Sequence, residues 1–213
     1  EGPVEVDFSG LFESDWNYES ATGAIFFALL DDGYFGVHSR DLVVLNREML
    51  LSGDFALTNP RERAERRLSI SLDVSKFDLN RVADYIPKNI PSNIQAWVTN
   101  SILSGLVTSG SFMFHGYSKS LVADHPPNFY IDALVEDLVV DYHPEWPLAY
   151  GIKGRINIDR KKVAAKLEGV STRGMHFSSA SVLTNNKEKH VNLYFEGQTR
   201  LEQLVDFLED IPS

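Results

Sequence analysis

The second half of the chain alternates apolar and polar residues with a period of two, and this pattern constrains the fold more than any other feature. A period of two sends successive side chains to opposite faces of a strand, so each strand has one apolar and one polar face. The phase of the alternation changes between Val135 and Leu138, which indicates a β-bulge near Glu136. The alternating segments are 129–135, 138–142, 152–159, 163–168, 175–177 and 191–196.

Turn-forming residues between these segments indicate antiparallel pairing. Residues 159–161 (Asp-Arg-Lys) and 185–187 (Asn-Asn-Lys) each separate two alternating segments, as hairpin turns do. The first eighty residues repeat the pattern less regularly, in segments 4–8, 23–30, 34–38, 42–45, 49–56 and 68–74. We therefore predict a mainly β fold, an extended antiparallel twisted sheet that forms an open groove or a partly closed barrel, with two or three short helices.

Helical periodicity appears in three short places. In the strongest of them we expect Ser92 as the N-cap and Gly105 as the end of the helix. Its apolar residues at helical spacing are Ile94, Trp97, Val98 and Ile102. The other two helices are predicted at 80–85 and 201–208. Three helices this short cannot cover a whole sheet face, so the sheet must close on itself or leave that face open to a hydrophobic guest.

No Gly/Ser-rich or Pro-rich linker divides the sequence, so we predict a single β-rich body over residues 1–213. The chain begins at Glu1 without an initiator methionine, and we expect it to be an excised segment of a longer protein. An apolar helix with an aromatic residue and an Ile-Pro pair recurs at 82–87 and 205–212. This recurrence suggests a β-repeat punctuated by helices near 80–105 and 200–210.

The formal net charge of −10 disfavours nucleic acid as a partner. One basic run, 61–67, is interrupted by Glu62 and Glu65 and follows the turn-forming Asn59-Pro60, so we interpret it as a solvated connector and not as a binding patch. The chain has no cysteine, which excludes a thiolate metal site or a thiol nucleophile.

A group of acidic residues with one histidine raises the possibility of metal or acid–base chemistry. Strict alternation would place several of these side chains on one face of a strand. No short-spaced ligand motif accompanies them, so we predict no metal site, no cofactor, no catalytic residue and no enzymatic activity. The residues of the group are Glu136, Asp137, Asp141, His143 and Glu145.

Four motifs in a fixed order resemble a known family. They are a Tyr-x-Pro element, a Trp-bearing helix followed by glycine, a glycine-bounded strand at 110–116, and a Tyr-x-x-x-Trp-Pro corner. This order resembles the central segment of AsmA-like bacterial envelope proteins of the YhdP type, over about 85–158, with a departure at 123–129. The motif residues are Tyr85, Pro87, Trp97, Gly105, Tyr142, Trp146 and Pro147.

The resemblance implies a periplasmic segment of an inner-membrane-anchored protein of a Gram-negative bacterium. Relatives of this type are thought to carry phospholipids between the inner and outer membranes along an apolar β-groove and so to maintain the outer-membrane barrier. The implied partners are a phospholipid or another envelope lipid, the rest of the protein's own longer chain, and other envelope proteins. The candidate lipid-lining residues are Ile152, Ile156, Ile158, Val163, Leu167, Val191, Leu193 and Phe195.

Two alternatives stay open at the level of sequence. The same apolar residues would also suit the interior of a closed sandwich or barrel, in which case the chain is a structural or interaction β-domain that binds no lipid. Trp97 and Trp146 suit either packing in the core or anchoring of a lipid or partner, and packing is the commoner role. Tyr142 is interpreted as a structural hydrogen-bond donor.

Overall fold

The computed structural model describes residues 4–6, 16–29, 34–46, 49–59, 66–86, 92–117, 128–143, 145–185 and 190–209. Within these residues, eleven strands form one antiparallel sheet in the order β13-β12-β11-β10-β9-β8-β6-β5-β4-β3, with β7 beside β8. The strands of this sheet are β3 (Ser20–Leu29), β4 (Phe35–Asn46), β5 (Met49–Asn59), β6 (Arg67–Ser75), β7 (Phe77–Asp78), β8 (Ile102–Tyr117), β9 (Asn128–Val140), β10 (Ala149–Asp159), β11 (Val163–Thr172), β12 (Met175–Asn185) and β13 (His190–Gln198).

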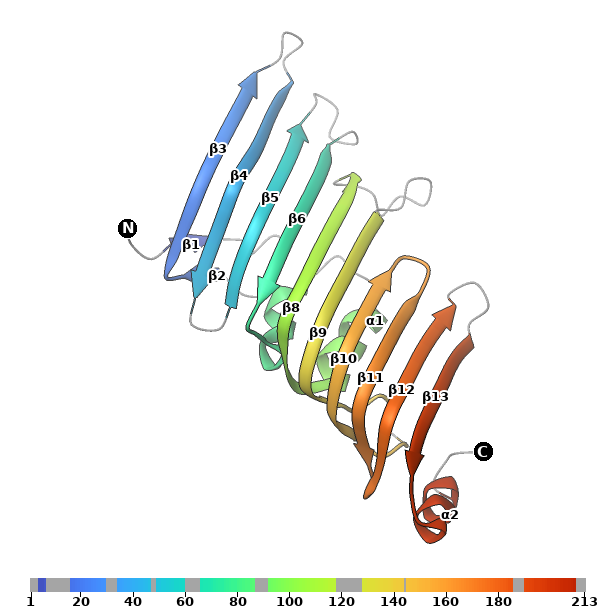
Figure 1. Ribbon diagram of the computed structural model, residues 1–213. Helices are drawn as coiled ribbons and strands as arrows, with labels where there is room; N and C mark the ends of the chain where they lie inside the picture. Colours follow the sequence, from blue (N-terminus) through green and yellow to red (C-terminus); the bar gives the residue numbers. More distant parts are fainter. Residues whose placement is uncertain are drawn as a thin grey trace.

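Figure 1 shows these strands as a single twisted row from β3 to β13. The order of strands does not join β3 to β13 in the described part of the chain, so the sheet is open. The first two strands in the sequence, β1 (Val4–Val6) and β2 (Trp16–Tyr18), pair with each other and form a separate two-stranded sheet. The predicted mainly β fold, an extended antiparallel sheet with short helices, is therefore confirmed, and of its two predicted forms the structure shows the open one and not the partly closed barrel.

Three helices accompany the sheet in the described residues: the 3₁₀ helix η2 (Leu79–Tyr85), α1 (Ser92–Ser101) and α2 (Leu201–Glu209). The first is capped by Asp78, whose carboxylate accepts a hydrogen bond from the Asn80 backbone N–H at 2.9 Å. The prediction that α1 ends at Gly105 is wrong, because Ile102 already pairs with Val140 as part of β8. The helix begins at Ser92 itself, which is thus its first residue instead of its cap.

One row of paired residues crosses all ten strands of the main path and contains no polar side chain. Directly opposed residues in neighbouring strands lie on the same face, so the row defines one face of the sheet, which we call the apolar face. At about 4.8 Å per strand the row spans roughly 43 Å. Its members, in order from β13 to β3, are Leu193, Val182, Ala165, Ile156, Ala133, Gly110, Val74, Leu51, Val44 and Ala21.

The adjacent row lies on the opposite face, which we call the polar face, and most of its side chains are polar or charged. Cross-strand pairs on this face include Ser111, which donates to Asp73 at 2.7 Å, and Arg155, whose Nε lies 3.5 Å from Asp132. Its members from β13 to β3 are Asn192, Leu183, Ala164, Asn157, Asp132, Ser111, Asp73, Ser52, Val43 and Thr22. The two-residue alternation therefore produces a sheet with two chemically different sides.

Among the described residues, the buried core cluster lies at one end of the apolar face. There η2 packs on β8, and α1 packs on both β8 and η2. Figure 1 shows α1 behind the lower part of the sheet, at the end of the strands opposite the β10–β11 turn. The core residues are Leu79, Val107, Val135, Leu138, Ala149, Ile152, Val170 and Ala180. The helices thus cover one end of the apolar face and leave the rest of it without a protein layer in the described part of the chain.

Bulges explain where the strands depart from simple alternation. The predicted bulge near Glu136 is confirmed, because the register shifts between Ser104 and Leu106 opposite it and Asp137 has φ 50°. Segments 34–38 and 42–45, predicted as two strands, form the single strand β4, which is interrupted by a register shift at Asp41 (φ 53°). A bulge restores the alternation in a new phase, so sequence alone makes one strand look like two.

The predicted hairpin between β10 and β11 is confirmed, and the carboxylate of Asp159 organises its turn. Asp159 Oδ1 accepts hydrogen bonds from the backbone N–H groups of Lys161 at 2.6 Å and Lys162 at 3.0 Å. The bond from Lys161, together with that from Lys162 and the two lysine charges, lowers the pKa of this carboxyl below its ordinary value. The turn predicted at 185–187 joins β12 to β13, but residues 186–189 lie outside the described part.

We expect the folded chain to hold Asp159 ionised at a pH where the unfolded chain has begun to protonate it. A folded-state pKa below the unfolded one contributes stability above about pH 4, and that contribution disappears as the pH falls through the folded-state pKa. NMR titration of the Asp159 carboxyl carbon in the folded protein and in urea measures both values. A folded-state midpoint equal to or above the urea value would contradict the turn geometry.

Candidate functional site

All eight candidate lining residues lie on the apolar face. Ile156 is opposite Ala165, Ile158 is opposite Val163, and Leu167 is opposite Gly154. On the outer strands, Phe195 pairs with Ala180, while Leu193 and Val191 pair with Val182 and Thr184. Ile152 pairs with Leu138 of the core. The structure therefore brings together residues that the sequence places up to 43 positions apart, although it does not test what they bind.

The eight residues differ in how much solvent they meet. Ile152 is 3% exposed and belongs to the core cluster, so it packs against protein and is not available to a guest. Ile156, Ile158, Val163 and Leu167 are half-buried by one another and by their neighbours in the sheet. The three residues of β13 are open, with Val191 61% and Leu193 44% exposed. Along β10, the apolar face thus changes from core at Ile152 to partly exposed surface at Ile156 and Ile158. Across the sheet, exposure increases toward β13.

The apolar face continues across the N-terminal half, where sequence analysis named no site residue. Its largest side chains there are half-buried aromatic and aliphatic groups at the centre of the sheet, and the outermost strand exposes Ile25, Phe27 and Leu29. The signal was present as alternation in segments 49–56 and 68–74, but only the register shows that these side chains share a face with β10 and β11. The central residues are Leu51, Phe55, Leu57, Leu68, Ile70, Leu72, Phe112, Phe114, Phe129 and Ile131.

No charged side chain lies on the apolar face within the ten described strands of the main path. Two of its few polar residues serve the sheet itself: Ser39 Oγ accepts from the Phe55 N–H and Thr184 Oγ1 accepts from the Val163 N–H, both at 2.8 Å. The others are Asn46, Asn59 and Thr172. A surface without charge suits contact with hydrocarbon and not with an ionic substrate.

The acidic group around β9 does not converge on one point. The bulge at Asp137 breaks the alternation on which the predicted common face depends. His143 Nδ1 accepts from the Glu145 backbone N–H at 3.3 Å, and the Asp141 N–H donates to the Ser101 carbonyl at 2.8 Å. Among the described residues no three His, Asp or Glu side chains come close enough to hold a metal ion.

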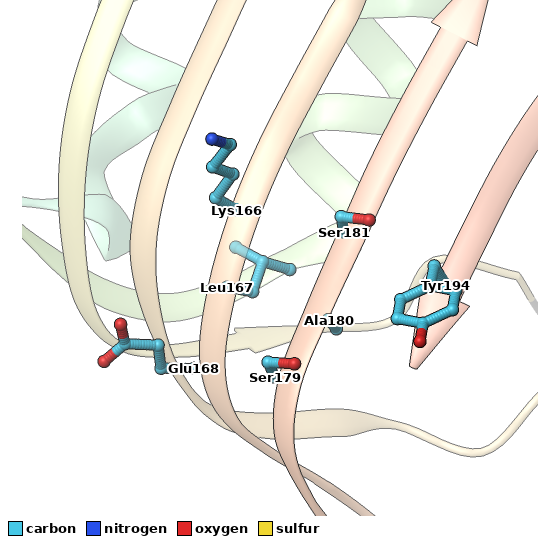
Figure 2. A pocket seen from close by; sticks show the side chains of 7 residues that line it. All are labelled: Lys166, Leu167, Glu168, Ser179, Ala180, Ser181 and Tyr194. Carbon is cyan, nitrogen blue, oxygen red and sulfur yellow. The ribbon is translucent and has the colours of Figure 1, made fainter. Parts of the chain in front are cut away.

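A shallow hollow of about 280 Å³ lies over β11, β12 and β13, and Figure 2 shows the seven residues around it. Five of them belong to the polar face, while Leu167 and Ala180 belong to the apolar face by the register of the strands. Most of the lining of the hollow is therefore on the polar face, and of the eight candidate lining residues only Leu167 borders it. The polar-face residues are Lys166, Glu168, Ser179, Ser181 and Tyr194.

Comparison with known protein families shows to which family the chain belongs. The chain matches the model of the YhdP protein family over residues 2–212, which is nearly its whole length. The chain belongs to the YhdP family. A search of curated proteins and a search of solved structures each gave no match. YhdP proteins are envelope proteins of the AsmA-like group, and no helix in the described residues is long and apolar enough to cross a membrane.

Two of the motif residues on which the resemblance to YhdP proteins rests, Tyr142 and Trp146, connect a helix to the sheet. At the corner after β9, the Tyr142 ring lies 5.7 Å from Trp146, and Trp146 lies 6.2 Å from Phe207 of α2. Burial, and then the charge of Asp141, raise the pKa of Tyr142, so its hydroxyl stays protonated at neutral pH. This corner therefore connects α2 to the end of β9, and the packing interpretation holds for Trp146.

The other motif residues are structural in different ways. The Tyr85 ring contacts Phe77 edge to face at 5.2 Å, and Gly105 is part of β8, where a Cβ would lie 2.9 Å from the Leu138 Cα. Trp97 is 50% exposed on α1 and so does not act as a core plug. Pro147 is half-buried at the corner, whereas Pro87 lies outside the described residues.

Proposed function

We propose that the apolar face carries the acyl chains of phospholipids, as one segment of a YhdP-family protein that moves lipid between the inner and outer membranes. The observation that supports this proposal is the uncharged row that crosses ten strands without a polar side chain. In the proposal the chain is not an enzyme and acts in the periplasm as part of an inner-membrane-anchored protein.

The energetics of the apolar face suit a carrier. Each methylene group that leaves water contributes roughly 0.8 kcal/mol, so even partial contact along an acyl chain favours binding. Neighbouring strands offer nearly equivalent aliphatic surfaces, as Ile156, Ala165 and Val182 do in adjacent positions of the row. A guest that moves from one strand to the next exchanges similar contacts and meets no charge, so the barrier between positions is low.

Replacing Leu193 by aspartate is expected to reduce phospholipid binding by about tenfold or more, because an ionised carboxylate in contact with hydrocarbon loses its hydration. Leu193 is exposed on an outer strand, so the substitution leaves the core intact. Native mass spectrometry of delipidated protein offered a phospholipid such as dioleoylphosphatidylethanolamine measures the bound fraction.

The matched control is Asn192→Asp, which adds the same charge one residue away on the polar face of β13. We expect this variant to bind lipid as the unmodified chain does. If both variants bind like the unmodified chain, or if the unmodified chain takes up no lipid at all, the lipid-carrying role of this face is wrong.

The second candidate function is that of an interaction domain that binds no lipid, and the unpaired edges of β3 and β13 favour it. Within the described residues each of these strands has a pairing partner on one side only, so its other side presents free backbone groups to a neighbouring chain. A pull-down from an envelope extract that retains a protein partner, together with absence of lipid adducts, would favour this alternative.

A further inference from the structure

The hairpin edge of the sheet, at the ends of the strands opposite α1 and η2, differs in charge from the rest of the molecule. In a chain of net charge −10, the described residues at this edge include five cationic side chains and one carboxylate, Asp159, which is engaged in its own turn. The cationic residues are Arg66, Arg67, Arg160, Lys161 and Lys162. In the described part of the chain, cationic side chains therefore outnumber carboxylates at the hairpin edge, which is the end of the sheet that α1 and η2 do not cover.

The strand register, continued by one residue, assigns one of these cations to the apolar side of the sheet. The register of β5 and β6 pairs Leu57 with Leu68 and Thr58 with Arg67. Continued by one residue, it places Arg66 opposite Asn59, which itself pairs with Phe35 on the apolar face. Arg66 is half-buried, although the sequence alone presents it as part of a solvated basic run.

Two polar atoms of this pair are left without partners. The Nε of Arg66 and the Oδ1 of Asn59 are both buried from solvent, and neither has a hydrogen-bond partner in the structure. Only Thr172 has another such side-chain atom among the described residues. A buried donor and a buried acceptor without partners are unfavourable, so two of them on residues that the continued register places opposite each other call for a specific explanation.

We propose that Arg66 and Asn59 bind the headgroup of a phospholipid, with the phosphate accepting from Arg66 and a headgroup ammonium or hydroxyl donating to Asn59. This inference rests on the proposed function, and it adds the class of lipid and its orientation. The occupant is a glycerophospholipid whose headgroup carries a donor, such as phosphatidylethanolamine. Its acyl chain extends from the hairpin edge along the strands toward the helices.

The length of the open face agrees with this orientation. From Leu68 to Val74, which packs against the core, β6 advances six residues, or about 20 Å at 3.3 Å per residue. The hydrocarbon of one membrane leaflet is about 15 Å thick, half of the ~30 Å core. A lipid with its phosphate at Arg66 thus reaches the helix-covered end with its chain in contact with apolar side chains throughout.

The test compares two lipids with the same acyl chains, dioleoylphosphatidylethanolamine and dioleoylglycerol, which lacks the phosphate and the ammonium. We expect the unmodified, delipidated chain to prefer the phospholipid by about tenfold or more, since hydrogen bonds to charged groups are the stronger ones. Arg66→Gln is expected to lower this preference to about twofold, and Arg66→Lys to retain part of it. Native mass spectrometry with both lipids in competition gives the ratio.

The matched control is Arg67→Gln, which removes the same charge from the adjacent residue on the polar face and should leave the preference unchanged. Circular dichroism establishes that each variant keeps its strands. An unchanged preference in Arg66→Gln, or an equal loss in Arg67→Gln, overturns the headgroup site while the apolar face still binds both lipids. Competition by millimolar inorganic phosphate would also overturn it, in favour of a site for free phosphate. Failure of the unmodified chain to bind either lipid would instead overturn the proposed function.

Discussion

Replacing Gly154 by alanine is expected to lower the stability of β10 and β11 by about 3 kcal/mol, because a side chain there is both conformationally strained and too close to the neighbouring strand. Gly154 has φ 145°, a conformation that L-residues rarely adopt. A Cβ at this position would lie 2.1 Å from the Lys166 carbonyl oxygen and 2.8 Å from the Leu167 Cα. Both are backbone atoms, so the neighbouring strand must shift to make room.

Amide hydrogen exchange of β10 and β11 measures this loss, because it reports the local opening free energy of individual strands. Gly36→Ala in β4 is the control, since a Cβ there meets only the Leu57 carbonyl oxygen at 3.8 Å and φ is not in the restricted range. Equal protection in the two variants would contradict the close approach of β10 and β11. Gly53 of β5 has a similar φ of 147°, and a Cβ there would lie even closer to a backbone atom of the neighbouring strand, the Ser71 carbonyl oxygen, so Gly53→Ala should behave as Gly154→Ala does.

Replacing Ile152 by alanine is expected to destabilise the helix-covered end by about 2–5 kcal/mol, because it leaves a cavity in a packed core. Ile152 is 3% exposed and lies with Leu138 and Val135 in the core cluster. Its neighbours belong to different strands and cannot easily collapse into the space. Hydrogen exchange of β9 and β10 near residues 138 and 152 measures the change.

Val191→Ala is the control for this prediction, because it shortens a side chain of the same face that is 61% exposed. Its effect on stability should stay below about 0.5 kcal/mol, as for most surface substitutions. If the apolar face carries lipid, Val191→Ala should reduce lipid binding more than Ile152→Ala does, which is the opposite of their order in stability. If Ile152→Ala proves as mild as Val191→Ala, Ile152 is not a core residue.

The sequence predicted most of the C-terminal half of the sheet because its strands alternate over long stretches and the phase change near Glu136 is visible in the sequence. Ile156 and Ile158 against Arg155 and Asn157 assign both the strand and its faces, and the turn at Asp159 assigns its partner. The N-terminal half was harder. Bulges such as that at Asp41 change the phase within a strand, and only backbone geometry shows that the strand continues.

The end of α1 could not be predicted because two periodicities overlap at Ile102. This residue fits the helical spacing from Ile94 and also begins the strand β8, where it pairs with Val140. The long-range pairing stabilises the strand conformation, which overrides the local helical preference. Gly105 has φ 144° and lies at a register shift within β8, so it is part of a β-bulge and does not terminate the helix.

The candidate site was predictable in part. Alternation identified the lining residues of β10, β11 and β13, but it could not separate Ile152 from the others, because burial under η2 and α1 depends on tertiary packing. The pair of Arg66 and Asn59 was not predicted at all. These residues are seven positions apart, and only the register of β5 and β6, continued by one residue, places them opposite each other on the apolar side.

The open sheet determines how the protein unfolds. Apart from the helices, each strand packs chiefly against its immediate neighbours in the described part of the chain, so cohesion is nearest-neighbour along the row. Arrays of this kind melt piecewise from their ends and not in one concerted step. Damage at β3 would leave β11 intact, and whole hairpins could be gained or lost over evolutionary time while the remainder kept its shape.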